Sequence, residues 1–466
     1  MDSERKRIIT ILVALCMGFV LLIGYLSYFQ MFKAQAVRDN AYNKRLWINE
    51  DNILRGSIVD RGGEVLVYSE SRDGETQRIY RYDNLYSHVI GYSLKDYGKS
   101  GLERRYNSYL VNANENTAIN ELINLINPSG VGNNLSLTLD HGLQKKTREL
   151  MNGKKGSAIA INPKTGEILS MVSLPDFRIE TLSENWTSVS ENPDSPLLNR
   201  GTQGLYTPGS IFKILTAVGV IQEGVPEAIY QCTGSTVIDG YTIRDFDESG
   251  HGPLNLEQAF AVSCNTYFAD QAVALGHDNL LRIAETLLFN QKIGFDTETN
   301  ASVFPRESIG LTDLGASGIG QGRVLTTPLN MLMVVSAVAN DGYMSMPYLV
   351  ETVQSPGGMT ISSHRSESRK VLEIGESQAL KRMMREVVES GTGTNAGING
   401  VKVAGKTGTA ENASGNNHAW FVGFAPLEDP KVAVIVLLEE EGASGGRAAA
   451  PIAREIIKFA LNNITN

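Results

Sequence analysis

The longest hydrophobic stretch lies near the N-terminus, where residues 8–29 form an almost unbroken apolar run without a charged side chain. A helix that crosses a membrane needs about 20 consecutive apolar residues, so this run predicts one transmembrane helix after a short basic tail. A cleaved signal peptide is the alternative, because Ala34-Gln35-Ala36 resembles a small-residue cleavage site. The hydrophobic core of a signal peptide usually has only about 7–15 residues, and the longer run therefore favours an uncleaved anchor.

The hydrophobic pattern beyond the anchor predicts two further modules. Residues 55–67 have the pattern of a strand, a Gly-Gly turn and a second strand. Residues 133–151 first alternate between polar and apolar and then show helical spacing. We therefore assign residues 1–33 to a tail and anchor, residues 34–150 to a smaller β-rich module, and residues 151–466 to a larger domain.

The larger domain has strand patterns at both ends and helical patterns between them. Residues 157–161 and 167–173 predict a hairpin, and three strands are predicted near the C-terminus, at residues 401–410, 418–426 and 431–439. The predicted helices cover residues 211–218, 254–275, 327–339, 377–390 and 451–461. Two segments are expected to be irregular, residues 175–200 and 355–370. Strands from distant segments predict one sheet covered by helices, which is an α+β fold.

The composition and charge of the chain narrow the possible classes of function. The chain has 466 residues and a formal net charge of -9, which argues against nucleic acid as a partner. Its three cysteines, Cys16, Cys232 and Cys264, show no spacing typical of a zinc site, and its six histidines are scattered, so we predict neither a metal nor a cofactor. Cys264 is interpreted as a small buried thiol, and a disulfide with Cys232 is the less favoured alternative.

Two groups of residues are interpreted as structural. Arg55, Asp60 and Arg61 surround the Gly-Gly turn of the smaller module and are expected to form a buried ion-pair network that holds this turn. The segment Gly320-Gln321-Gly322 is expected to be a structural loop that lines a site without taking part in its chemistry.

The segment from Tyr206 to Lys213 contains candidate chemistry. Pro208 and Gly209 interrupt the preceding chain, and the apolar residues that follow predict a helix that begins at Ser210. Ser210 and Lys213 are three residues apart, so on a helix their side chains can meet. A serine hydroxyl becomes a nucleophile when a base takes its proton, and burial favours the neutral lysine that such a base requires. The alternative is an ordinary amphipathic helix with a capping serine.

Two further motifs follow in chain order, Ser263-Cys264-Asn265 and Lys406-Thr407-Gly408-Thr409. Together with Ser210-x-x-Lys213, they resemble the Ser-x-x-Lys, Ser-x-Asn and Lys-Thr-Gly signature of the serine β-lactamases and penicillin-binding proteins. Other segments resemble the same family, namely residues 55–63, 195–200, 320–322, 404–410 and 418–423. Over nearly its whole length after the anchor, the chain is similar to the class B, monofunctional transpeptidases of the penicillin-binding protein A kind. This resemblance implies that the sheet of the larger domain is antiparallel and flanked by helices.

The resemblance implies a role for each polar residue of the first two motifs. Ser210 is expected to be the nucleophile, and Lys213, neutral in the free enzyme, is expected to be the general base. The alternative for Lys213 is that it steadies another group that takes the proton, since the base is disputed in this superfamily. Ser263 is expected to relay a proton to the departing amine. Asn265 is expected to bind a substrate amide and to steady Lys213.

The third motif is expected to hold the terminal carboxylate of the substrate. Lys406 supplies positive charge in this interpretation, and Thr407 and Thr409 offer hydroxyl groups. Gly408 is expected to let the substrate backbone lie against the strand edge. In the family, the oxyanion hole consists of two backbone N–H groups, which match Ser210 and Thr409 here.

The resemblance implies a peptidoglycan D,D-transpeptidase that is acylated on Ser210 by D-Ala-D-Ala stem peptides and by β-lactams. It also implies a single-pass protein of the cell membrane, with its catalytic domain outside the cytoplasm. A glycan polymerase of the SEDS type (shape, elongation and division) is the implied membrane partner. The alternatives are a D,D-carboxypeptidase or β-lactamase, in which water is the acceptor, and a non-catalytic β-lactam sensor or scaffold.

Overall fold

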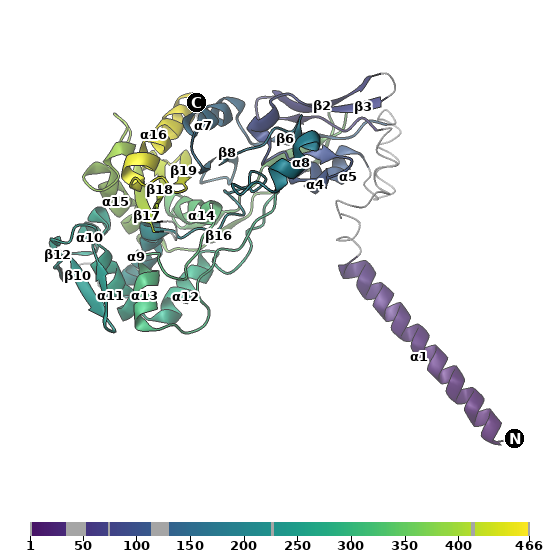
Figure 1. Ribbon diagram of the computed structural model, residues 1–466, viewed down its shortest axis with the longest axis horizontal. Helices are drawn as coiled ribbons and strands as arrows, with labels where there is room; N and C mark the ends of the chain where they lie inside the picture. Colours follow the sequence, from purple (N-terminus) through teal and green to yellow (C-terminus); the bar gives the residue numbers. More distant parts are fainter. Residues whose placement is uncertain are drawn as a thin grey trace.

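The computed structural model describes residues 2–33, 53–72, 75–112, 130–224, 228–411 and 415–464. Helix α1 (Asp2–Phe32) covers the hydrophobic run, and Figure 1 shows it apart from the body of the protein. Almost all of its described side chains are exposed, and within the described residues it is the one helix that is long and apolar enough to cross a membrane. The possible cleavage site Ala34-Gln35-Ala36 lies outside the described residues.

The larger domain is built on a five-stranded antiparallel sheet with the strand order β17-β18-β19-β7-β8. Its strands are β7 (Gly156–Ile161), β8 (Ile168–Leu174), β17 (Ala404–Ala410), β18 (His418–Ala425) and β19 (Val432–Leu438). Ile435 of β19 lies opposite Ile159 of β7, so the C-terminal strands join the hairpin from the start of the domain. The predicted antiparallel sheet from distant segments is confirmed.

Helices cover both faces of this sheet, because successive residues of a strand point to opposite sides. Ala158 of β7 belongs to the same hydrophobic cluster as Ile456 of α16, whereas its neighbour Ile159 belongs to a second cluster with Leu332 of α14. Helices α7 (His141–Leu150) and α16 (Gly445–Asn463) therefore cover one face, and α14 (Pro328–Ala339) packs on the other. All residues of α14 are buried, which explains its almost entirely apolar sequence.

The larger domain contains further helices and three small two-stranded sheets. The helices are α8 (Leu182–Ser190), α9 (Lys213–Gln222), α10 (Leu256–Val262), α11 (Asn265–Leu275), α12 (His277–Thr286), α13 (Leu311–Gly318) and α15 (Ile374–Glu389). Short 3-10 turns are η2 (Gly209–Phe212) and η3 (Thr394–Ala396). Three two-stranded antiparallel sheets pair β9 (Tyr230–Cys232) with β12 (Gly252–Leu254), β10 (Ser235–Ile238) with β11 (Tyr241–Arg244), and β13 (Tyr343–Ser345) with β16 (Ser368–Lys370).

Several predicted elements differ from the structure. The predicted helix at residues 254–275 is divided into α10 and α11, because Ser263 adopts a left-handed conformation between them. Helix α16 begins well before Pro451 and continues through it. Residues 175–200 contain α8, and residues 355–370 contain β15 and β16, which pair with the preceding strands β14 and β13.

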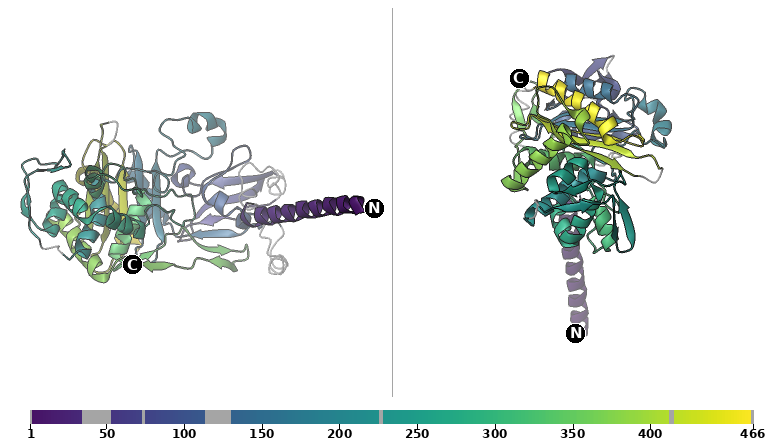
Figure 2. Two further views of the ribbon diagram at one scale, coloured as in Figure 1. Left: turned by 90° about the horizontal axis from the view of Figure 1, so that it is seen from below. Right: turned by 90° about the vertical axis from the view of Figure 1, so that its left-hand side faces the viewer.

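The smaller module shares its sheet with the larger domain. Six strands follow the order β15-β14-β6-β1-β2-β3. They are β1 (Ile58–Val59), β2 (Val65–Arg72), β3 (Glu75–Tyr80), β6 (Asn134–Leu137), β14 (Val350–Gln354) and β15 (Thr360–Ser363). Strands β14 and β15 come from the chain between α14 and α15, and Val353 of β14 lies opposite Leu135 of β6. Figures 1 and 2 show β2 and β3 at the opposite end of the body from helices α9 to α13.

Short elements complete the smaller module. They are η1 (Asp83–Tyr86), β4 (Ser93–Leu94), β5 (Gly98–Lys99), α4 (Gly101–Arg105) and α5 (Asn107–Leu110). Helix α4 carries Glu103, which is fully buried and accepts hydrogen bonds from Arg55 Nη2 at 2.6 Å and Arg78 Nε at 2.8 Å. Burial would raise the pKa of Glu103, but the two guanidinium groups outweigh burial and hold this pKa at about 2.

The predicted network among Arg55, Asp60 and Arg61 is wrong in its partners. Arg55 pairs with Glu103, whereas Arg61 lies 3.8 Å from the carboxylate of Glu167 in the larger domain. Asp60 holds the Gly-Gly turn through backbone groups, since its Oδ1 accepts N–H bonds at 2.8 Å from both Gly62 and Glu64. The turn is therefore stabilised by an acceptor for backbone N–H groups and not by a local ion pair.

Candidate active site

Ser210 lies on η2, the single turn that directly precedes α9. Gly209 makes this turn possible, because its φ is 56° and a Cβ there would lie 2.5 Å from Thr409 O of β17. The N–H of Gly209 also donates to Gly320 O at 2.9 Å. Strand β17 and the Gly320 segment thus hold the turn from two sides, and the Ser210 side chain remains partly exposed.

Lys213 is the first residue of α9 and is fully buried. Its Nζ donates to three oxygen atoms of the second motif: Ser263 O at 2.6 Å, Ser263 Oγ at 3.2 Å and Asn265 Oδ1 at 2.7 Å. In the part of the chain that the structure describes, Ser210 Oγ is not among the hydrogen-bond partners of Nζ in this conformation. Such bonds are often long before substrate binds and shorten in the reactive complex.

The protonation of Lys213 follows from its burial. Removal from water lowers the pKa of Lys213 to about 7, while nearby Cys264 and Asp245 act weakly in the opposite direction. The Nζ atom also lies 5.6 Å from the centre of the Phe268 ring. A substantial fraction of Lys213 is therefore neutral near pH 7, which is the state that a general base requires.

Ser263 and Asn265 occupy the break between α10 and α11. Ser263 has a φ of 61°, a left-handed conformation that costs about 1–3 kcal/mol for a residue with a side chain. Asn265 uses both ends of its amide, since Oδ1 accepts from Lys213 while Nδ2 donates to Arg244 O at 2.9 Å. The buried carboxylate of Asp245 accepts the backbone N–H of Asn265 and fixes the start of α11.

Lys406 lies on β17 and is also fully buried. Its Nζ donates to Ser263 Oγ at 2.9 Å and to Thr407 O at 3.2 Å. Burial, together with the neighbouring Lys213, lowers the pKa of Lys406 well below its ordinary value. The Ser263 hydroxyl therefore connects the two lysines, and all three motifs meet at this one oxygen atom.

The rest of the third motif lies along β17, an edge strand of the sheet. Thr407 is almost buried, and its Oγ1 lies 2.6 Å from Thr392 Oγ1. At Gly408, a Cβ would lie 3.0 Å from Pro208 O, so the missing side chain makes room for the turn that carries Ser210. This packing reason differs from the predicted approach of substrate backbone. Thr409 Oγ1 accepts the N–H of Gly445 at the start of α16, at 3.4 Å.

Sequence patterns missed two features of this region. The first is Thr392, which follows α15 and reaches Thr407, although nothing in its local sequence marks it. The second is a cluster of Cys232, Asp245, His251 and Cys264 behind the second motif, where the sequence predicted no metal ligands. Both cysteines are free thiols, so the alternative of a Cys232–Cys264 disulfide is not realised.

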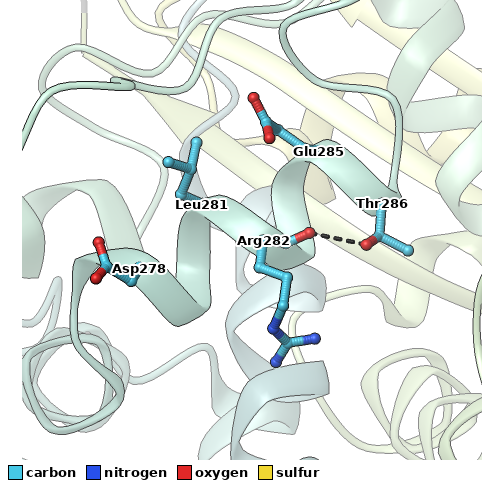
Figure 3. A pocket seen from close by; sticks show the side chains of 5 residues that line it. All are labelled: Asp278, Leu281, Arg282, Glu285 and Thr286. Atoms are coloured by element: carbon cyan, nitrogen blue, oxygen red, sulfur yellow. Dashed lines mark hydrogen bonds between the residues drawn. The ribbon is translucent and has the colours of Figure 1, made fainter.

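A concave region on α12 lies outside the candidate active site. Figure 3 shows that five side chains of this one helix line it: Asp278, Leu281, Arg282, Glu285 and Thr286. The Thr286 hydroxyl donates to Arg282 O at 2.8 Å within the helix, and Arg282 reaches Gln222 of α9 at 3.1 Å. None of the residues of the three motifs lines this region.

Comparison with known proteins places this geometry in a family. The penicillin binding protein transpeptidase domain matches residues 156–458, and the penicillin binding protein A dimerisation domain matches residues 55–134. The chain is 34% identical to the peptidoglycan D,D-transpeptidase PbpA of Mycolicibacterium smegmatis, over 99% of each chain.

Solved structures show the same fold. Penicillin-binding protein A from M. tuberculosis, as its ceftriaxone acyl-enzyme complex, has a TM-score of 0.83 and 28% identity, covering 89% of this chain and 100% of that one. A D,D-transpeptidase domain from Eggerthella lenta has a TM-score of 0.79 and 32% identity, covering 88% of this chain and 99% of that one. The chain therefore belongs to the family of penicillin-binding proteins that carry a transpeptidase domain.

Proposed function

We propose that this protein is a peptidoglycan D,D-transpeptidase that forms its acyl-enzyme on Ser210. The observation that carries the proposal is the buried Lys213, whose pKa lies at about 7 and whose Nζ binds both Ser263 and Asn265. A neutral lysine one helical turn from a partly exposed serine is the pairing that acyl transfer requires.

The first half-reaction is acylation. Ser210 Oγ attacks the carbonyl carbon of the penultimate D-alanine, and its proton passes to Lys213. When the tetrahedral intermediate collapses, the peptide bond breaks, the departing amine takes up a proton through Ser263, and D-alanine leaves. The contact of Ser263 Oγ with both Lys213 Nζ and Lys406 Nζ supports this relay. Asn265 steadies Lys213 and faces the substrate amide.

The intermediate and the carboxylate of the substrate need separate donors. The backbone N–H groups of Ser210 and Thr409 are the proposed oxyanion hole, and loss of one such donor typically costs about 10²–10³ in rate. The hydroxyls of Thr407 and Thr409 are proposed to bind the terminal carboxylate, as the edge position of β17 allows. Because burial lowers the pKa of Lys406, its positive charge is favoured most when this carboxylate is bound.

In the second half-reaction, the amine of a neighbouring stem peptide attacks the acyl-enzyme, and Ser210 is released. Water as the acceptor would make the enzyme a D,D-carboxypeptidase instead. A pentapeptide donor and a separate amine acceptor distinguish these outcomes, because transpeptidation yields a cross-linked product whereas hydrolysis yields only D-alanine and the shortened donor.

Covalent labelling tests the assignment of the nucleophile. We expect a fluorescent penicillin to label the full chain and expect Ser210→Ala to abolish the label. Ser363→Ala, at an exposed position on β15, is the matched control and should be labelled like the wild type. Intact mass and peptide mapping should place the adduct on the peptide that contains Ser210, and an adduct elsewhere would refute the proposal.

We further propose that α1 anchors the protein in the cell membrane with the catalytic domain outside the cytoplasm, and that α1 and the smaller module bind a SEDS-type polymerase. The apolar, exposed surface of α1 supports the anchor. Co-purification tests the partner, and replacement of α1 by an unrelated membrane span is the informative variant. A deletion through residue 150 would also remove β6, to which β14 pairs. Co-purification that is undiminished both after replacement of α1 and after deletion of residues 1–150 would contradict the proposal.

A further inference from the structure

Four potential metal ligands converge directly behind the second motif. They are Cys232, Asp245, His251 and Cys264. Their two Sγ atoms, one carboxylate oxygen and one imidazole nitrogen all lie within 4.8 Å of one another. Three of the side chains are buried, and that of His251 is 19% exposed.

Four of the six distances between ligand atoms are close to those of tetrahedral coordination. Cys232 Sγ lies 3.1 Å from Asp245 Oδ2 and 3.3 Å from His251 Nδ1. Asp245 Oδ2 lies 3.6 Å from both Cys264 Sγ and His251 Nδ1. Zinc bonds of about 2.0–2.3 Å to such ligands place neighbouring ligand atoms roughly 3.3–3.8 Å apart in a tetrahedron. Small side-chain movements would therefore be enough for the four atoms to share one ion.

Backbone N–H groups and one hydroxyl surround the two sulfur atoms, whose thiols point at Asp245 Oδ2. The backbone N–H of His251 donates to Cys232 Sγ at 3.3 Å, and the N–H of Tyr267 donates to Cys264 Sγ at 3.4 Å. The hydroxyl of Thr266 lies 3.4 Å from Cys232 Sγ and 3.2 Å from Cys264 Sγ. Such outer donors orient the ligands of a metal site and offset their negative charge.

A cation would also complete the environment of Asp245. This carboxylate is 4% exposed, and among the described residues no lysine or arginine forms a salt bridge with it. A buried carboxylate is costly unless it is paired or coordinates a metal. Two sulfur atoms, one nitrogen and one oxygen form a donor set that favours zinc over the hard cations calcium and magnesium.

We propose that Cys232, Asp245, His251 and Cys264 bind one structural zinc ion that holds the second motif in place. Binding forms two Zn–S bonds, one Zn–N bond and one Zn–O bond, and it releases the two thiol protons. Cys264 lies between Ser263 and Asn265, so a bond from its sulfur to zinc fixes both neighbours. The same ion holds Asp245, which accepts the N–H of Asn265, and it thereby supports the left-handed conformation of Ser263.

Metal analysis of the full chain, purified in detergent without chelator, tests this inference. We expect about one zinc ion per chain in the wild type. Cys232→Ser and His251→Asn should each lose most of the zinc, whereas Cys16→Ser, at an exposed position in α1, should retain it. After replacement of zinc by cobalt, the wild type should show a thiolate-to-cobalt charge-transfer band that Cys232→Ser lacks.

Thermal unfolding supplies a readout that does not depend on activity. A chelator should lower the unfolding midpoint of the wild type but leave that of Cys232→Ser unchanged. Circular dichroism confirms that each variant is folded, and penicillin labelling is scored separately, so the zinc site can fail while the proposed function stands. Three results would overturn the inference: a wild type free of zinc after incubation with zinc and reductant, zinc retained by Cys232→Ser and His251→Asn together, or a linked Cys232–Cys264 peptide in a non-reducing digest.

Discussion

The smaller module and the active-site region both bury charged side chains, but they treat these charges in opposite ways. In the smaller module, Arg55 and Arg78 surround Glu103 and keep its pKa at about 2, so the carboxylate remains charged. In the active site, Lys213 and Lys406 are equally buried, and within the described residues neither forms a salt bridge with a carboxylate. Their pKa values are lowered instead. A compensated charge stays ionised and stabilises the fold, whereas an uncompensated one shifts towards the neutral form that the proposed base requires.

The two arrangements contribute to stability with opposite signs, and each contribution changes over its own pH range. Because the pKa of Glu103 falls from 4.5 to about 2 on folding, its contribution to stability is present above about pH 4.5 and is lost as the pH falls towards 2. Lys213 has a pKa of about 7 when folded and 10.5 when unfolded, so it opposes folding most strongly below pH 7. This cost fades as the pH rises from 7 to 10.5.

The largest expected effect is loss of catalysis without loss of stability. Lys213→Met removes the proposed base and should slow acylation by penicillin by about 10²–10⁴-fold. Its unfolding midpoint near neutral pH should be equal to or higher than that of the wild type, because the variant no longer buries a group that prefers to be charged. Stopped-flow acylation and thermal unfolding measure the two effects. Lys292→Met, at an exposed position, is the control and should change neither the acylation rate nor the unfolding midpoint. A strongly destabilised Lys213→Met would contradict the proposed difference between Lys213 and Glu103.

The opposite result is expected for the compensated charge. Glu103→Gln leaves Arg55 and Arg78 buried without a carboxylate and should lower the free energy of unfolding by about 3–5 kcal/mol. The protein that remains folded should still be labelled by penicillin on Ser210. Urea unfolding provides the measurement, with Glu64→Gln as the control, because Glu64 pairs with Arg81 at the surface. If Glu103→Gln and Glu64→Gln had the same free energy of unfolding, the ion pairs around Glu103 would not be what stabilises the smaller module.

The pH dependence of acylation sharpens the same comparison. Because the proposed base is neutral Lys213, whose pKa is about 7, the acylation rate constant should rise about tenfold per pH unit below pH 7 and level off above it. The apparent value belongs to the coupled pair of Lys213 and Lys406. A rate that is constant from pH 5 to 9 would assign the base to another group.

The smallest expected effect concerns the substrate carboxylate. Thr392 positions Thr407 through a hydroxyl–hydroxyl contact of 2.6 Å, so Thr392→Val should free the Thr407 side chain to rotate. A neutral hydrogen bond contributes about 0.5–1.5 kcal/mol, so we expect the KM for a stem-peptide donor to rise several-fold with kcat nearly unchanged. Thr392→Ser should restore the wild-type KM. A change in kcat alone would indicate a different role.

Hydrophobic spacing predicted the membrane-spanning helix and a sheet from distant segments, and the ordered motifs with the family resemblance predicted its antiparallel arrangement and the three segments that carry polar site residues. Ser210 and Lys213 could be placed on neighbouring turns from the sequence because three residues separate them, although the predicted helix begins at Lys213 and not at Ser210. The division of residues 254–275 into two helices could not, because the left-handed Ser263 depends on Asp245 and on contacts with Lys213 and Lys406. The same limit applies to Arg55, whose partner Glu103 lies far along the chain.

The residue types and their order thus determined which candidate reactive side chains are present, namely a serine, two lysines and the polar groups between them. The fold established the state of these groups, because a pKa depends on burial and neighbours that come from distant segments. Burial of Lys213 without a carboxylate partner makes it a candidate base. The meeting of Cys232, Asp245, His251 and Cys264 has the same origin, since their separation along the chain hides a cluster that folding brings within 4.8 Å.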